Sequence, residues 1–381
     1  MKKIFSNIVL FFSLFLIVSV TDVFSHPAWG IVIDKNKQIY FSDLETIYKI
    51  DSQGKLSIFR AGVSGRHVHD LSIDAGGNIY GWENVYEPQT EKHLRAFWKM
   101  SPKGEFTEIV SLTENLPSGM SIWRDSGGNT YSVEPWNNEK KETKIIRRTP
   151  DGKTSVFAGG KYGYLDGQKE KAEFSVITDM AFGTDDTIYL TNDDKVRKID
   201  KSGKVTTIYR NEISNKNQKN TETSSRLFGL DIDKQNNVFV ADFDNSRILK
   251  ISSDGKVSTL LNSEKEWTPI GVATFDDEVY VLEGRPYSAS KHAGNRVSKV
   301  SPTGKSTIIA NLEDRNKSNN NRNSNKNNLL LQTEEEKNLI SNAASNNINT
   351  SAYPLGFYGI VGAVSIAFIA LIFLIRKKLI V

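Results

Sequence analysis

Six similar segments follow one another through residues 30–310, with a period of about 47 residues. Each copy opens with an apolar run, a polar turn and a second apolar run, as in GIVIDKNKQIYFSD and GLDIDKQNNVFVAD. A period of this length is typical of repeat folds, in which each copy is one supersecondary unit. The copies begin at Gly30, Asp70, Gly119, Asp179, Gly229 and Gly271.

Each copy contains four short runs rich in Ile, Val, Thr, Tyr and Phe, the composition of β-strands. A glycine stands in the turn between the third and fourth runs (SQGK, PKGE, PDGK, KSGK, SDGK and PTGK). Glycine supplies the positive φ that a short hairpin requires. Four antiparallel strands repeated six times predict an all-β fold, a six-bladed β-propeller over residues 26–312. An up-and-down sandwich, the alternative, does not explain the regular period.

The two ends of the chain have the composition of targeting and membrane segments. Lys2 and Lys3 precede an apolar stretch that is closed by Val23-Phe24-Ser25, the layout of a secretory signal peptide over residues 1–25. Residues 355–375 are uncharged and precede Arg376, Lys377 and Lys378. This pattern predicts a transmembrane helix over 354–376, with a short cytoplasmic tail at 377–381. We therefore expect an exported protein, anchored in the cell membrane with its propeller outside.

Residues 313–353 differ in composition from the repeats. Residues 311–350 contain 14 Asn among 40 residues and few large apolar side chains. Such a segment cannot bury enough apolar surface to fold, and it predicts a disordered tether between the propeller and the membrane helix.

Charge and cysteine content exclude several function classes. The chain carries 49 basic and 45 acidic residues, a net charge of +4, and the two ends supply all of the excess. The remaining residues have no net charge, whereas a nucleic-acid-binding protein needs a basic surface, so we expect no nucleic-acid partner. The chain has no cysteine, which excludes disulfides, thiol catalysis and cysteine-bound zinc.

The repeats resemble a known propeller family. Residues 238–260 (VFVADFDNSRILKISSDGKVSTL) are similar to an NHL repeat, and residues 158–183 are similar to the linker and entry of another. NHL and related propellers include binding scaffolds, an amidating lyase that holds zinc with histidines, and lactonases of the gluconolactonase type. The resemblance therefore implies the fold without deciding the function. The lyase takes histidines from several blades, whereas copies 3–6 have none at the position of His67.

Insertions fall on one predicted face of the propeller. They lie at Asn84–Arg95, Pro135–Thr143 and Gly284–Asn295 inside copies, and at Lys161–Val176 and Asn211–Ser225 between copies. Loops between second and third strands share a face with the crossings between blades. Because binding residues concentrate on loops carried by a rigid scaffold, we expect any site on this insertion face.

An acid or amide follows the aromatic residue of each second strand by three positions. In three copies this residue is a glutamate that precedes a long insertion: Glu83, Glu134 and Glu283. These glutamates are candidate ligand-binding residues, because their carboxylates reach further than those of aspartates. The alternative is a structural role, in which the side chain caps the strand. Trp82 and Trp136 lie close to the same rim and are candidates for stacking on a ligand.

His67 and His69 alternate on an extended segment, so their side chains project to the same side. Together with Asp70 they are candidate ligand-binding residues. His26, His67, His69 and Glu83 form a candidate set for a divalent metal, zinc or calcium. The alternative is that these histidines are hydrogen-bonded residues lining a polar channel.

Two functions remain open, and the sequence leaves enzymatic activity undecided. The first is a membrane-anchored scaffold that binds a protein, peptide or glycan on the insertion face. The second is a metal-dependent hydrolase or lyase with a divalent ion in the central channel. The sequence contains no phosphate-binding loop, nucleophile elbow or H-E-x-x-H motif, which favours the scaffold.

Overall fold

A computed structural model describes residues 28–116, 121–134, 141–211, 226–285 and 294–313. The predicted signal peptide, membrane helix and cytoplasmic tail, and all but the first residue of the tether, lie outside these ranges. In the part of the chain that the structure describes, no helix is both long and apolar enough to cross a bilayer.

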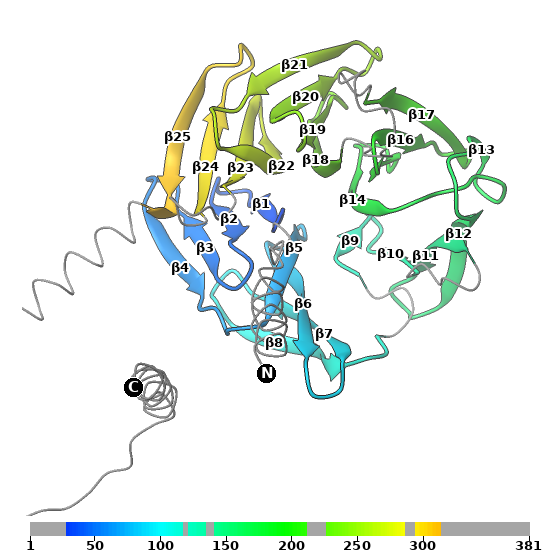
Figure 1. Cartoon of the computed structure of the whole chain (residues 1–381), viewed down its shortest axis with the longest axis horizontal. Helices are drawn as coiled ribbons and strands as arrows, with labels where there is room; N and C mark the ends of the chain where they lie inside the picture. The colour runs from blue at the N-terminus through cyan, green and yellow to red at the C-terminus, as the bar shows by residue number, and fades with distance from the viewer. Residues whose placement is uncertain (1–27, 117–120, 135–140, 212–225, 286–293, 314–381) are drawn as a thin grey trace, which may run out of the picture. The chain divides into compact units, whose positions relative to one another are not determined.

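The structure is a six-bladed β-propeller, as the repeats predict. Six antiparallel sheets surround a common axis, with β1, β5, β9, β14, β18 and β22 innermost (Figure 1). Blade 1 holds β1 (Ile31–Ile33), β2 (Ile39–Ser42), β3 (Ile47–Ile50) and β4 (Leu56–Arg60). Blade 2 holds β5 (His67–Ile73), β6 (Ile79–Glu87), β7 (Lys92–Met100) and β8 (Phe106–Thr113). Blade 3 holds β9 (Trp123–Arg124), β10 (Thr130–Val133), β11 (Glu142–Arg148) and β12 (Thr154–Lys161).

The second half of the ring repeats this arrangement with one addition. Blade 4 holds β13 (Gly167–Gln168), β14 (Ile177–Phe182), β15 (Ile188–Asn192), β16 (Lys195–Ile199) and β17 (Lys204–Arg210). Blade 5 holds β18 (Leu227–Ile232), β19 (Val238–Asp242), β20 (Arg247–Ile251) and β21 (Val257–Asn262). Blade 6 holds β22 (Thr268–Phe275), β23 (Glu278–Arg285), β24 (Gly294–Val300) and β25 (Ser306–Asn311).

The extra strand β13 comes from the crossing between blades 3 and 4. It pairs antiparallel with β17 and makes blade 4 a five-stranded sheet. The crossing is held by Arg197, whose side chain is fully buried and donates to Leu165 O and Asp166 Oδ1, both at 2.8 Å. The predicted insertion Lys161–Val176 is therefore partly an edge strand anchored to the blade.

The turns explain the regular spacing of polar residues in the repeats. The glycine between third and fourth strands has a φ between 79° and 92° in all six blades, as predicted. The turn between first and second strands uses an aspartate in blades 1, 2, 3 and 5. In blade 2, Asp74 Oδ1 accepts from Asn78 N at 2.9 Å, and Asp74 Oδ2 accepts from the Tyr80 hydroxyl at 3.0 Å. An Asx turn of this kind needs only one short polar side chain.

Within the described residues, the ring closes without a borrowed strand. Blade 1 is built only from residues 31–60 and blade 6 only from residues 268–311, so the first and last blades meet by packing. Ile31 and Phe41 of blade 1 share a buried apolar core with Ile270 and Leu282 of blade 6. Glycine allows the innermost strands to approach: a β-carbon at Gly229 would stand 2.8 Å from Gly271 Cα.

The predicted insertion Asn84–Arg95 is mostly strand. β6 and β7 pair without interruption from Ile79↔Met100 to Glu87↔Lys92. The hairpin thus lengthens blade 2 at the insertion face, and it places the side chains of Trp82, Asn84 and Arg95 on a rigid sheet.

Candidate functional site

The residue three positions after the aromatic of the second strand is buried in four of the six blades. These residues are Glu83, Asn192, Asp242 and Glu283, with at most 1% of the residue exposed. Each contacts an arginine. The Glu283 carboxylate accepts from Arg296 Nε at 2.7 Å and from Arg296 Nη2 at 3.1 Å, and from Ser298 Oγ at 2.9 Å. Burying a charged carboxylate costs free energy unless the carboxylate is paired. The arginine contacts therefore allow these side chains to be buried.

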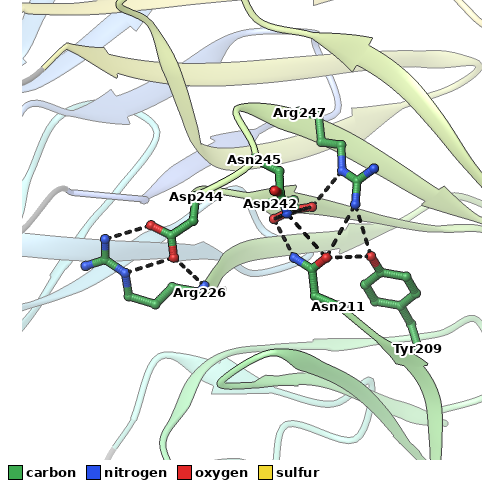
Figure 2. A network of polar contacts seen from close by, with 7 residues as sticks. All are labelled: Tyr209, Asn211, Arg226, Asp242, Asp244, Asn245 and Arg247. Carbon is green, nitrogen blue, oxygen red and sulfur yellow. Dashed lines mark hydrogen bonds and ion pairs between the residues drawn. The ribbon is translucent and has the colours of Figure 1, made fainter. Parts of the chain in front are cut away.

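Asp242 shows the most extended of these arrangements (Figure 2). Its carboxylate accepts from Arg247 Nε and Asn211 Nδ2, both at 2.7 Å, and from Asn245 Nδ2 at 3.0 Å. The Tyr209 hydroxyl donates to Asn211 Oδ1 at 3.0 Å. Beside this network, Asp244 binds Arg226 through both carboxylate oxygens. Residues of blade 4 and of blade 5 both contact Asp242. These contacts indicate the structural role, in which the side chain stabilises the end of the strand.

Glu83 and Glu134 lie in different surroundings. The Glu83 carboxylate binds Arg60 of blade 1 and accepts from Arg66 Nη1 at 3.1 Å. Glu83 pairs with Val68 on the face of blade 2 that packs against blade 1, whereas His67 is on the opposite face. Glu134 is exposed at the end of β10. Trp136 and His26 lie outside the described residues.

The histidines and Trp82 do meet, at the start of the innermost strands. His69 lies between Trp29 and Trp82, with ring centroids 5.6 and 5.7 Å away. His67 is 6.0 Å from His69. Trp29 N and Gly30 N both donate to His69 O, at 2.8 and 2.9 Å, which fixes blade 1 against blade 2. We call Trp29, His67, His69, Asp70 and Trp82 the entry cluster.

Asp70 is buried at the inner end of the entry cluster, with 6% of the residue exposed. Its Oδ1 accepts from Leu71 N at 2.8 Å, whereas its Oδ2 has no hydrogen-bond partner among the described residues. Burial raises the pKa of Asp70 to about 7, and the hydrogen bond from Leu71 N and the nearby indoles of Trp29 and Trp123 offset part of this rise. Burial therefore favours the protonated form of Asp70.

A second buried carboxyl group, Asp179, interacts electrostatically with Asp70. Burial and the nearby charge of Asp70 raise the pKa of Asp179 well above its ordinary value. Both of its oxygens have partners: Oδ1 accepts from Trp123 Nε1 at 3.0 Å, and Oδ2 accepts from Leu230 N at 2.8 Å. Asp179 therefore also joins blade 4 to blade 5. The sequence contains a signal for this pair, because Asp70 and Asp179 open their copies where the four others have glycine.

The predicted metal set is not assembled in the described part of the chain. No group of three or more His, Asp or Glu side chains there is placed to hold a metal ion. Glu83 is turned toward two arginines, away from His67 and His69. The described members of the set, His67, His69 and Glu83, therefore do not fit a divalent ion by themselves, and we derive no reaction step through one.

The comparisons with known proteins give the fold and no family. The sequence matches no protein-family model, and a search of curated proteins finds no relative. The resemblance to NHL repeats is thus not confirmed. Solved structures with the same architecture include virginiamycin B lyase from Staphylococcus aureus, at 15% identity and a TM-score of 0.44, covering 74% of this chain and 94% of that one.

Two further structures have similar values. A gluconolactonase from Xanthomonas campestris is 12% identical, with a TM-score of 0.45, covering 67% of this chain and 83% of that one. A luciferin-regenerating enzyme is 15% identical, with a TM-score of 0.46, covering 72% and 90%. The three neighbours are enzymes by name. Identities this low indicate the shared fold alone.

Proposed function

We propose that the propeller binds a small molecule at the entry cluster and acts on it as a hydrolase or lyase. The observation that carries this proposal is the position of His69. Its imidazole lies between two indole rings, and it is adjacent in the chain to Asp70, a buried carboxyl group with one oxygen that has no partner among the described residues. Flat apolar rings bind a substrate, and imidazole and carboxyl groups are the side chains that most often act as general acids and bases.

The residues have distinct roles in this proposal. Trp29 and Trp82 provide the flat surfaces on either side of His69. In hydrolysis of an ester, the His69 imidazole accepts a proton from the attacking water, and the protonated Asp70 carboxyl donates one to the leaving oxygen. A general acid is most effective when its pKa lies near the working pH, and the Asp70 pKa of about 7 meets this condition.

A scaffold that binds a protein, peptide or glycan is the second candidate function. It is favoured by the buried pairs at the strand ends. Glu83 and Glu283 were candidate ligand contacts, but their carboxylates are held by arginines and contribute stability to the blades. If Asp179 and Asp70 likewise serve only to join blades, the insertion face binds without chemistry.

Hydrolysis assays separate the two functions. Aryl esters and lactones, represented by 4-nitrophenyl acetate and dihydrocoumarin, are offered to the full-length protein and to Asp70→Asn and His69→Gln variants. We expect each variant to lower kcat/KM by at least ~10²-fold, the usual contribution of a general acid or base. His93→Gln is the matched control, because His93 lies on the β6–β7 hairpin next to Tyr86, outside the entry cluster. Absence of turnover, or equal turnover in all four proteins, supports the scaffold.

We also propose that the site works outside the cell membrane, held there by the C-terminal segment. The charge-free run of residues 355–375 and the basic residues that follow support this location. Protease added to intact cells should remove the propeller while a C-terminal fragment stays in the membrane fraction. Recovery of the whole chain in the soluble cell fraction contradicts the proposed location.

A further inference from the structure

A row of three polar side chains crosses the middle of blade 2, beside the entry cluster. His67 of β5 pairs with Asn84 of β6, and Asn84 pairs with Arg95 of β7. Paired residues of an antiparallel sheet share a face, and neighbouring strands lie about 4.8 Å apart. The three side chains therefore project side by side from three strands. Trp82 is two residues before Asn84 and shares the same face.

Among the described residues, no acid balances the charge of Arg95. Its guanidinium lies 5.8 Å from the centroid of the Trp82 ring, and in the described part of the chain it forms no ion pair. The nearby glutamates are bound elsewhere: Glu83 to Arg60 and Arg66 on the opposite face, and Glu114 to Lys92 at 2.5 Å. An arginine held over a tryptophan, with no acid, is positioned to receive an anion from solution.

Asn84 adds a second requirement for the ligand. Its Oδ1 is buried and accepts no hydrogen bond among the described residues. A buried amide oxygen without a donor costs free energy, which a ligand hydroxyl or N–H group would recover. Because Asn84 stands between His67 and Arg95, this donor should lie close to the anionic group of the ligand.

We infer that the row His67–Asn84–Arg95 binds the carboxylate and neighbouring hydroxyl of a hydroxy acid whose ring lies beside Trp82. Arg95 binds the carboxylate, Asn84 Oδ1 accepts from the hydroxyl, and His67 contacts the same polar end. The inference rests on the proposed function in one respect, since Trp82 and His67 belong to the entry cluster as well. It specifies the ligand as an anion, which the entry cluster alone does not.

Three probes of similar size test the separate contacts by calorimetric titration of the full-length protein. Mandelate has a ring, a hydroxyl and a carboxylate; mandelamide lacks the charge; phenylacetate lacks the hydroxyl. We expect mandelate to bind at least ~10-fold more tightly than either of the others, as the loss of one hydrogen bond to a charged or buried group predicts. Equal affinity for mandelate and mandelamide, or no binding of mandelate, overturns the inference.

Variants assign the contacts. Arg95→Gln should weaken mandelate binding at least ~10-fold and remove the preference over mandelamide. Asn84→Asp keeps the shape of the side chain, so the sheet should be preserved while the new charge repels mandelate. Arg148→Gln is the control. Arg148 is at the end of β11, beside the turn at Gly152 that joins the third and fourth strands, on the face of the propeller opposite to the insertion face. Unchanged mandelate affinity in Arg95→Gln overturns the inference.

Failure of the anion-binding inference can be distinguished from failure of the proposed enzymatic function. If mandelate fails to bind while ester hydrolysis depends on His69 and Asp70, the inference is wrong and the proposed function stands. If mandelate binds through Arg95 and Asn84 while no ester or lactone is turned over, the anion site stands and the enzyme proposal fails.

Discussion

The carbonyl oxygen of Trp29 lies directly against Gly271, so that a β-carbon on residue 271 would stand 2.1 Å from it. Trp29 precedes the first strand of blade 1 and Gly271 is in the first strand of blade 6. This contact is part of the junction where the ring closes without a shared strand. Glycine at position 271 is therefore a requirement of closure.

Gly271→Ala should destabilise the whole propeller. The added methyl group forces the backbones of blades 1 and 6 apart, and overpacking of this kind costs about 1–3 kcal/mol. Urea unfolding, followed by tryptophan fluorescence, measures the change. Gly160→Ala is the matched control: no atom lies within 4 Å of the added carbon, and we expect a change within about 0.5 kcal/mol. Equal stability of the two variants contradicts closure by glycine contact.

Glu283→Ala should lower the free energy of unfolding far more than Glu134→Ala, although both occupy the end of a second strand. Removing Glu283 leaves Arg296 with the exposed Glu264 as its one acidic partner among the described residues, and breaking a buried pair costs about 3 kcal/mol. Glu134 is exposed, so its replacement should cost less than about 0.5 kcal/mol. Urea unfolding of the two variants measures the difference, and similar losses would mean that the buried pairs contribute little to the blades.

Asp231 should make the protein less stable as the pH rises from about 4 to 6. Burial raises its pKa to about 6, partly offset by hydrogen bonds from Ile232 and Thr274. The folded state then binds more protons than the unfolded state between the two pKa values, so the free energy of unfolding falls across this range. Asp231→Asn should remove this dependence of the free energy of unfolding on pH, which amounts to at most about 3 kcal/mol over the whole range. Melting curves of the natural protein and the variant from pH 4 to pH 8 measure this dependence. The same pH dependence in both proteins would show that Asp231 is not its cause.

A His67→Ala/His69→Ala variant should contain as much divalent metal as the natural protein. The described residues provide no third ligand for these two histidines. Metal content of the full-length protein, purified without chelator, measures this directly, with His93→Ala as the control. A stoichiometric ion that is lost only in the double variant would require a further ligand outside the described residues, and His26 is the first to test.

The repeats alone predicted the six blades, because each polar turn depends on a local residue. Gly54 and its five equivalents adopt positive φ in every blade, and Asp74 closes its turn within four residues. Strand β13 was not predicted, since its anchor, Arg197, binds residues more than thirty positions away in the chain. Turns that depend on neighbouring residues can be predicted from a sequence, whereas contacts between residues far apart in the chain cannot.

The candidate site was predicted in part. The alternation of His67 and His69 indicated that they would lie together, and they do. The prediction that Glu83 would join them was not met, because the arginines that bind Glu83 come from the end of blade 1 and the crossing after it. The sequence predicts a loop insertion at Asn84–Arg95, since a long hairpin and a loop have similar polar composition. Only the register of β6 and β7 places those side chains on one face.

The most direct test is the ratio of kcat/KM for hydrolysis of dihydrocoumarin between His69→Gln and His93→Gln proteins of equal stability. The two variants make the same change, one at the entry cluster and one on the hairpin. The proposed function predicts a ratio of about 10⁻² or lower. A ratio near one, or no hydrolysis by the natural protein, contradicts a catalytic entry cluster and leaves the propeller as a binding scaffold.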